Sequence, residues 1–229
     1  MKLHYIGIIK NESKPSHELV AEKDLSAYSR FTRNKYVAPI YLCKSYCVDI
    51  DLEENIQERA KAYIKHSYGE FMSMFSKTVA ERTRPGQRQD VEEQDYTFHA
   101  YGRSEGVCGI IISDHAYPAL VAHQLLSKML DEFLSLHPKS EWGTTNPTLS
   151  FPALKDYLIK YQDPQQADSI MKIQKELDET KIVLHKTIES VLQRGEKIDD
   201  LVAKSDGLSA QSKMFYTQAK KQNSCCVLM

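Results

Sequence analysis

The chain has almost no net charge and no concentrated basic stretch. Its 30 Lys and Arg residues are balanced by 31 Asp and Glu residues, which gives a formal net charge of −1. Nucleic-acid-binding proteins usually carry a basic surface, often with aromatic side chains among the basic ones. Neither feature occurs here, so we expect no nucleic-acid partner.

Long apolar segments are also missing. A helix that crosses a bilayer needs about 20 predominantly apolar residues, and the longest apolar runs here resemble the short stretch GVCGIII. The N-terminus, MKLHYIGIIK, lacks the order of charged, apolar and small residues of a secretory signal. We therefore expect a chain that is made in the cytosol and has no spanning helix.

Enzyme signatures are missing as well. The chain has no G-x-x-x-x-G-K-[ST] motif, which excludes a nucleotide-binding P-loop. Its eight His residues and its carboxylates show no metal or catalytic-triad spacing, so we expect no catalytic residue, metal or cofactor; His185 is interpreted as a solvated helix residue. An odd number of cysteines, five, argues against a disulfide framework. Cys43, Cys47 and Cys108 are interpreted as buried or neutral thiols without a function.

What is present begins with an alternation of strand-like and helix-like segments in the first 137 residues. Alternating and apolar patterns predict strands in 1–10, 16–26, 95–103 and 105–113, and 3-4 spacing predicts helices over 53–84 and 117–136. These elements indicate an antiparallel α+β domain. Residues 138–163, rich at first in Ser, Thr, Asn and Pro, are predicted to form a linker with a short helix.

Residues 164–222 carry a sustained heptad pattern typical of a coiled coil. Between Ile170 and Gln222 there is no proline, and a helix of that length would span about 80 Å. Such a helix needs partner helices; alone, we expect the segment to fray or to dock on its own N-terminal domain, because Thr and Ser occupy several seam positions. The predicted apolar layers are Ile170, Ile173, Leu177, Leu184, Val191, Ile198, Leu201, Leu208 and Phe215.

Arg194 interrupts this seam at its middle. A guanidinium brings five donors and no acceptor, so its burial without partners costs several kcal/mol. One interpretation is that the seam selects helices that offer amide oxygens at the same level, such as those of Gln. The other is that Arg194 lies at a tolerant edge and directs its charge outward.

The last seven residues, 223–229, form a predicted lipidation tail. Cys226-Val227-Leu228-Met229 fits the C-a-a-X pattern, and a terminal Met favours farnesyl transfer. Four terminal residues also match by chance, but Cys225 adds a second acylatable thiol and two lysines lie just upstream. One prenyl chain binds membrane weakly, so a second lipid on Cys225 would decide residence there.

Several motifs together resemble one family. The stretch DETKIVLHKTIESVLQRGEKIDDLV, residues 178–202, is similar to the core of an R-SNARE motif. MKLHYIGIIK, ERTRPGQRQDVEE and YGRSEGVCGIIISD followed by AYP are similar to longin-domain segments. With the CC-a-a-X end, nearly the whole chain resembles a prenylated longin-type R-SNARE of the YKT-type synaptobrevin homologues.

This resemblance implies a function in intracellular vesicle fusion. It implies an N-terminal longin domain (1–137) with a profilin-like antiparallel sheet and flanking helices, followed by a SNARE coiled-coil helix that zippers with three Q-SNARE helices. Arg194 matches the ionic layer. A prenyltransferase would farnesylate Cys226, and Cys225 would receive palmitate or a second prenyl group, with methylation of the processed end.

The resemblance further implies autoinhibition. In the family, the longin domain folds onto its SNARE segment and shelters the lipid in a groove, which matches Phe71, Met72, Met74 and Phe75; the family's aromatic residue at position 74 is absent. The implied location is the cytoplasm and the cytosolic face of Golgi, ER-derived vesicle, endosomal or vacuolar membranes, with a part in ER–Golgi protein transport.

Residues 34–66 depart from the family, being either a genuine insertion or translated intron sequence. A second function class also stays open: a prenylated coiled-coil tether or adaptor that binds partners without fusing membranes.

Overall fold

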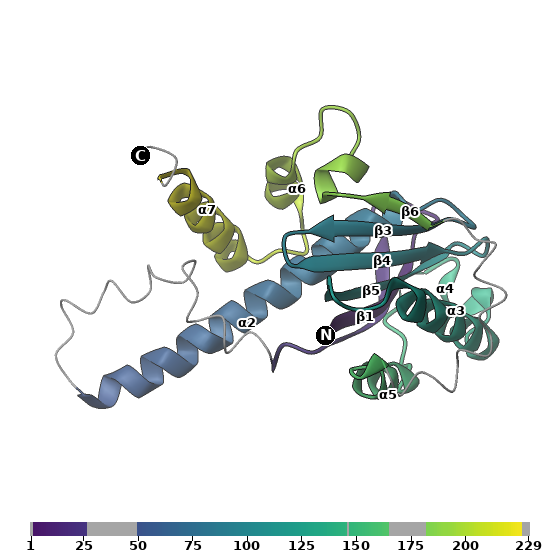
Figure 1. The fold of residues 1–229 in the computed structure, drawn as a ribbon, viewed down its shortest axis with the longest axis horizontal. Helices are drawn as coiled ribbons and strands as arrows, with labels where there is room; N and C mark the ends of the chain where they lie inside the picture. The colour runs from purple at the N-terminus through teal and green to yellow at the C-terminus, as the bar shows by residue number, and fades with distance from the viewer. Residues whose placement is uncertain (1, 27–49, 146, 165–181, 226–229) are drawn as a thin grey trace. The chain divides into compact units, whose positions relative to one another are not determined.

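The computed structural model describes residues 2–26, 50–145, 147–164 and 182–225 (Figure 1). They belong to two compact units: a sheet unit (Met1–Asp24 with Phe75–Ile198) and a helical unit (Leu25–Met74 with Asp199–Met229). The elements are β1 Leu3–Lys10, β2 His17–Lys23, α2 Ile50–Glu81, β3 Arg88–Glu93, β4 Tyr96–Gly102, β5 Val107–Asp114, α3 Ala119–Leu136, α4 Lys139–Trp142, α5 Ala153–Lys160, β6 Ile182–His185, the 3-10 helix η5 Ile188–Val191, α6 Ile198–Lys204 and α7 Ala210–Cys225.

The sheet unit is built on six strands in the order β2-β1-β5-β4-β3-β6. Five of them form an antiparallel sheet, as predicted, and β6 joins its edge in parallel to β3. The α+β prediction is confirmed, and the strands predicted at 1–10, 16–26, 95–103 and 105–113 correspond to β1, β2, β4 and β5. The sheet is mixed because a segment from the C-terminal third of the chain adds the sixth strand.

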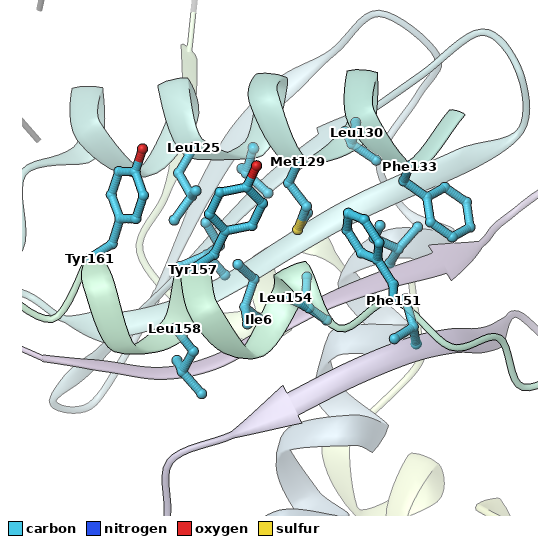
Figure 2. Packing of buried hydrophobic residues seen from close by; sticks show 14 of the residues in the cluster. Ile6, Leu125, Met129, Leu130, Phe133, Phe151, Leu154, Tyr157, Leu158 and Tyr161 are labelled. Atoms are coloured by element: carbon cyan, nitrogen blue, oxygen red, sulfur yellow. The ribbon is translucent and has the colours of Figure 1, made fainter. Parts of the chain in front are cut away.

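Both faces of the sheet are covered. Successive strand residues point to opposite faces, so His99 on β4 meets α3 while its neighbour Phe98 faces the end of α2, where Phe75 lies 6.5 Å away between ring centroids. On the α3 side a single apolar core joins β1, β5, α3 and α5 (Figure 2). Phe133 of α3 sits in this core edge-to-face with Phe151, at 5.8 Å.

The segment 138–163, predicted as a linker with a short helix, packs within the sheet unit. The predicted helix is α5, whose Leu154 is fully buried. Trp142, at the end of α4, is also fully buried, and its indole N–H donates to the carbonyl of His137 at 3.2 Å. Ser, Thr and Pro content alone therefore does not reveal that this segment contributes large side chains to the core.

The sequence did not predict β3, because the first half of this strand is polar. Arg88, Gln89 and Asp90 are all buried, and burial of such groups is tolerated only when they find hydrogen-bond partners. The guanidinium of Arg88 donates to the carbonyl of His123 at 3.1 Å and lies 3.7 Å from the centroid of the Tyr101 ring. Partners supplied by α3 and β4 thus make a strand from a sequence that reads as a loop.

The helix predicted over 53–84 is confirmed as α2, and the one over 117–136 as α3. The continuous helix expected between Ile170 and Gln222 is not what the structure has. Over residues 182–225 the chain forms β6, η5, α6 and α7 in turn. Some apolar side chains of this segment, among them Ile188, Val202 and Leu208, are buried within their own chain, which agrees with the expectation that the lone segment docks on its own N-terminal part.

In the helical unit, α7 packs against the middle of α2. Ser212 and Ser67, both fully buried, lie 3.0 Å apart between their hydroxyl oxygens. The ring of Phe215 lies 6.1 Å from that of Tyr68, and Tyr216 lies 6.1 Å from Phe71. The contact is a layer of small polar residues flanked by aromatic ones.

Candidate functional site

Residues 182–198 form the part of the C-terminal segment that docks on the sheet unit. β6 pairs in parallel with β3, with Ile182 opposite Arg88 and His185 opposite Val91. His185 is therefore a half-buried strand residue, and its interpretation as a solvated helix residue is wrong. Next along the chain, the backbone N–H of Ile188 donates to Glu93 at 3.0 Å, and the Ile188 side chain is fully buried.

A four-residue turn comes next, from Gln193 to Glu196. The N–H of Glu196 donates to the carbonyl of Gln193 at 2.9 Å, and Gly195 has φ +91°. The Glu196 carboxylate in turn accepts the N–H of Gln193 at 2.8 Å. The turn is thus closed by one backbone bond and one side-chain bond.

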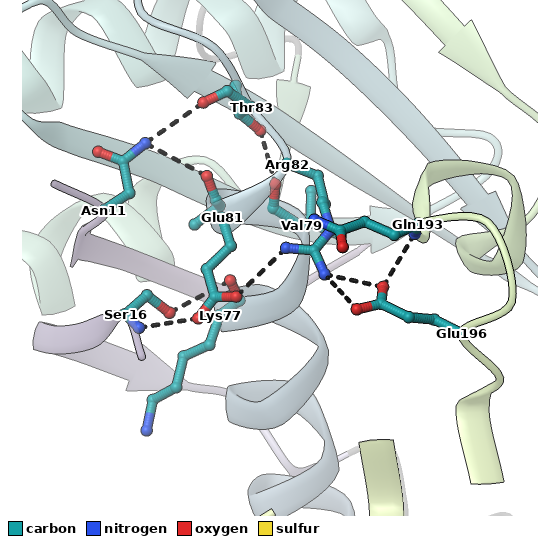
Figure 3. Close-up of polar contacts among 10 residues, drawn as sticks. Asn11, Ser16, Lys77, Val79, Glu81, Arg82, Thr83, Gln193 and Glu196 are labelled. Atoms are coloured by element: carbon teal, nitrogen blue, oxygen red, sulfur yellow. Dashed lines mark hydrogen bonds and ion pairs between the residues drawn. The ribbon is translucent and has the colours of Figure 1, made fainter. Parts of the chain in front are cut away.

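An ion pair fixes this turn to the end of α2 (Figure 3). Arg82 donates to both carboxylate oxygens of Glu196, at 2.8 and 3.1 Å. Arg82 also reaches Glu81 at 3.4 Å, and Glu81 accepts the backbone N–H of Ser16 at 2.8 Å. Hydrogen bonding from Arg82 and from the Gln193 backbone holds the pKa of Glu196 below its usual range. We call this pair, Arg82 with Glu196, the clasp.

Arg194 is exposed in the middle of the turn. This position outside the core agrees with the second interpretation, in which Arg194 directs its charge outward. Arg194 lies in a turn, however, and not at the edge of a helical seam. The clasp engages its neighbour Glu196 and leaves the guanidinium of Arg194 at the surface.

The predicted seam positions divide into several groups. Ile170, Ile173 and Leu177 lie outside the described residues. In the sheet unit Leu184 is 59% exposed, while Val191 and Ile198 are half-buried. In the helical unit Leu201 and Phe215 are half-buried and Leu208 is 6% exposed. The structure therefore does not bring these positions together as one stripe.

The predicted groove residues lie on consecutive turns of α2. Met72 and Met74 are buried, and Phe71 and Phe75 are half-buried, each beside another aromatic ring. Their role as a lipid groove stays a prediction.

The predicted lipidation residues lie at the limit of the structure. Cys225 is the last residue of α7, and Cys226 lies outside the described residues. Cys43 and Cys47 also lie outside them. Cys108 is fully buried on β5, where burial raises the pKa of its thiol to about 12, which confirms its interpretation as an inert buried thiol.

Sequence spacing missed a buried polar cluster between the sheet and α3. One carboxylate oxygen of Asp90 lies 2.8 Å from Nδ1 of His99 and 2.7 Å from Nε2 of His123. Within the described ranges this is the one group of three whose side chains could hold a metal ion. Its facing atoms already satisfy one another, however, and the Arg88 guanidinium lies beside it. The arrangement is well explained as a structural link, and the absence of a metal or cofactor stays a prediction.

Burial and hydrogen bonding set the charges in this cluster. Burial opposes ionisation of Asp90, but hydrogen bonds from His123 and His99 outweigh it and hold the pKa of Asp90 well below its usual range. Burial lowers the pKa of His123 despite its bond to Asp90. The Nδ1 atom of His123 is buried with no hydrogen-bond partner. His123 is therefore held in its neutral form.

Comparison with known families matches both parts of the chain. The family model of the longin domain, described as a regulated-SNARE-like domain, matches residues 60–158, and the synaptobrevin model matches residues 169–227. Over the residues that the structure describes, we find no helix with the length and apolar character of a membrane span.

Curated relatives match over their full length. The synaptobrevin homolog ykt6 of Schizosaccharomyces pombe is 52% identical over 228 residues, which cover 100% of both chains. The synaptobrevin homologs YKT6 of Saccharomyces cerevisiae and Candida glabrata are 49% and 48% identical, again with 100% of each chain covered.

Proposed function

Because the chain belongs to the Ykt6-type synaptobrevin homologues, R-SNAREs with an N-terminal longin domain and no enzymatic activity, we propose that it drives vesicle fusion by zippering with three Q-SNARE helices. The observation that carries the proposal is Arg194, the one charged residue among the apolar layers predicted from Ile170 to Phe215, in the region that matches synaptobrevin. Its five donors suit a layer of three Gln amide oxygens.

Autoinhibition is part of the proposal. A seam that is to meet partner helices cannot at the same time be engaged on its own chain. Here Leu208 and Ser212 are buried within the helical unit, and Ile182–His185 is paired with β3 in the sheet unit. These contacts support a resting state in which the segment is withheld until it is released from both places.

Membrane attachment would come from lipids on the C-terminal cysteines. We propose that a prenyltransferase farnesylates Cys226 and that Cys225 receives palmitate or a second prenyl group, since a single chain holds a protein only weakly to a bilayer. When the lipid is withdrawn, Phe71, Met72, Met74 and Phe75 of α2 would shelter it. The protein would then exchange between cytosol and the cytosolic face of Golgi, ER-derived, endosomal or vacuolar membranes.

Reconstitution separates a fusion protein from a tether. The full chain, lipid-anchored on one set of liposomes, is mixed with liposomes that carry three Q-SNARE helices, and clustering and lipid mixing are followed separately. We expect lipid mixing with the wild-type chain. In Arg194→Ala the three amide groups lose their donor, at a cost of about 1–3 kcal/mol for an unsatisfied buried group, so the bundle should melt lower and lipid mixing should slow.

Arg84→Ala is the matched control, because Arg84 is an exposed arginine outside the seam. It should leave lipid mixing unchanged. Clustering of liposomes without lipid mixing by the wild-type chain would instead identify a tether.

A further inference from the structure

This inference rests on the proposed function. If the chain has that function, the four residues Gln193 to Glu196 must adopt two incompatible backbone conformations. In the structure they form a tight turn, closed by the 2.9 Å bond from the Glu196 N–H to the Gln193 carbonyl. In a SNARE bundle they would be part of a continuous helix, where each residue has φ near −63°. Helix formation therefore has to break this turn at the level of Arg194.

Gly195 can adopt the backbone conformations of both the turn and the helix. Its φ of +91° is strained for a residue with a side chain, and a turn with positive φ only at its third residue is the type II pattern, which favours Gly or Asn there. A Cβ added at Gly195 would meet no heavy atom within 4 Å. The need for glycine is thus a matter of backbone conformation alone and owes nothing to packing.

The clasp holds the turn in place. Glu196 uses its carboxylate twice, to accept the N–H of Gln193 and to receive both Nη2 contacts of Arg82. The side chains of Arg82 and Glu196 are 13% and 32% exposed, so solvent and salt screen this pair somewhat less than a pair on an open surface. In a helix the N–H of Gln193 would turn to the carbonyl of residue 189, four residues before it, and would leave the Glu196 carboxylate.

We propose that the Gln193–Glu196 turn is the switch between the resting and the bundle-forming segment. Gly195 makes the turn possible, the clasp of Arg82 and Glu196 holds it, and its conversion to helix carries Arg194 from the protein surface into the bundle. The glycine and the glutamate beside the ionic residue are therefore positioning residues of the resting state.

Hydrogen exchange of the full chain tests the part of Gly195, with the amides of β6 and Ile188 as the readout. Gly195→Ala removes the tolerance for positive φ and favours helix, so exchange there should rise at least about tenfold. Gly207→Ala is the matched control: it gives the segment the same gain in helix propensity, but Gly207 is not among the glycines with positive φ. It should change exchange at β6 much less.

Gly195→Asn sharpens the comparison, because Asn tolerates positive φ better than Ala. Exchange in this variant should fall between those of wild type and Gly195→Ala. Slow exchange at β5 in every variant verifies that the sheet itself stays folded.

The clasp is tested in the same way. Glu196→Gln keeps the size of the side chain and removes its charge, so we expect exchange at β6 to rise several-fold. Glu189→Gln makes the same change of charge at an exposed position of the same segment and should have no effect.

Two results would overturn the switch: equal exchange in Gly195→Ala and Gly207→Ala, or equal exchange in Glu196→Gln and Glu189→Gln. If the chain still drove lipid mixing with Q-SNARE liposomes, the proposed function would survive that result. If the wild-type chain formed no bundle while the exchange pattern held, the turn would be a structural feature and the function would be wrong.

Discussion

Asp90 shows how single residues set the behaviour of the sheet unit. The side chain of Asp90 is 9% exposed, and its carboxylate accepts hydrogen bonds from two imidazoles on different elements, β4 and α3. The negative charge of Asp90 is compatible with burial only because these donors replace water. The hydrogen bond from His123 to the Asp90 carboxylate therefore holds α3 on the sheet in addition to the apolar packing.

This cluster predicts a pH dependence of stability. The pKa of His123 is lower in the folded state than its unfolded value of about 6.5, so the unfolded state binds more protons. The contribution of neutral His123 should be complete above pH 6.5 and should decline as the pH falls towards its folded pKa. Thermal melting at pH 7.5, 6.5 and 5.5 measures this decline.

His123→Gln is the comparison for that experiment, because Gln can still donate to Asp90 but does not titrate. The fall in melting temperature between pH 7.5 and 5.5 should shrink in this variant. An unchanged slope would show that other groups cause the pH dependence.

The sequence identified some of the important single residues and missed others. Arg194 stood out because a charge on an apolar seam is visible in the letters alone. The partners of Asp90 did not, because His99 and His123 are 9 and 33 positions away and only the fold brings them together. Arg82 and Glu196, 114 positions apart, were missed for the same reason.

At the scale of elements, prediction succeeded where the local pattern and the final environment agree. The strands β1, β2, β4 and β5 and the helices α2, α3 and α5 have clear apolar periodicity, and all were predicted. β3 was not predicted because three of its four buried residues, Arg88, Gln89 and Asp90, are polar. The segment 182–225 failed because its heptads describe a bundle with other chains, whereas the structure of the lone chain shows what the same residues do without those partners.

The packing of α3 predicts how a buried and an exposed residue of this helix respond to truncation. Phe133 is fully buried and Leu136, one turn on, is 58% exposed. Phe133→Ala should lower the free energy of unfolding by about 3–5 kcal/mol, and Leu136→Ala by less than about 0.5 kcal/mol. Urea unfolding can be followed through Trp142, the single tryptophan of the chain, which is buried in the same core. Equal losses in the two variants would contradict the packing described for this helix.

At the scale of the whole molecule, the proposal joins a folded chain to a membrane through two adjacent thiols. Cys226→Ser should abolish both farnesyl labelling and membrane recovery, because no first lipid is added. Cys225→Ser should leave a farnesylated but mostly cytosolic pool, since one chain binds reversibly. Cell fractionation with farnesyl and palmitate analogues measures both. Membrane recovery and labelling that persist in Cys226→Ser would refute the anchoring proposal.

The pairing of β6 with β3 has a consequence for the aggregation of the protein. While β6 is paired, the backbone groups on that side of β3 are satisfied. If the segment leaves β3 as proposed, the edge of β3 would be left unpaired, and an unpaired edge can pair with strands of neighbouring copies. On the proposed function, an opened molecule would be prone to self-association until its partner helices bind, so rapid binding of these helices would also protect it from aggregation.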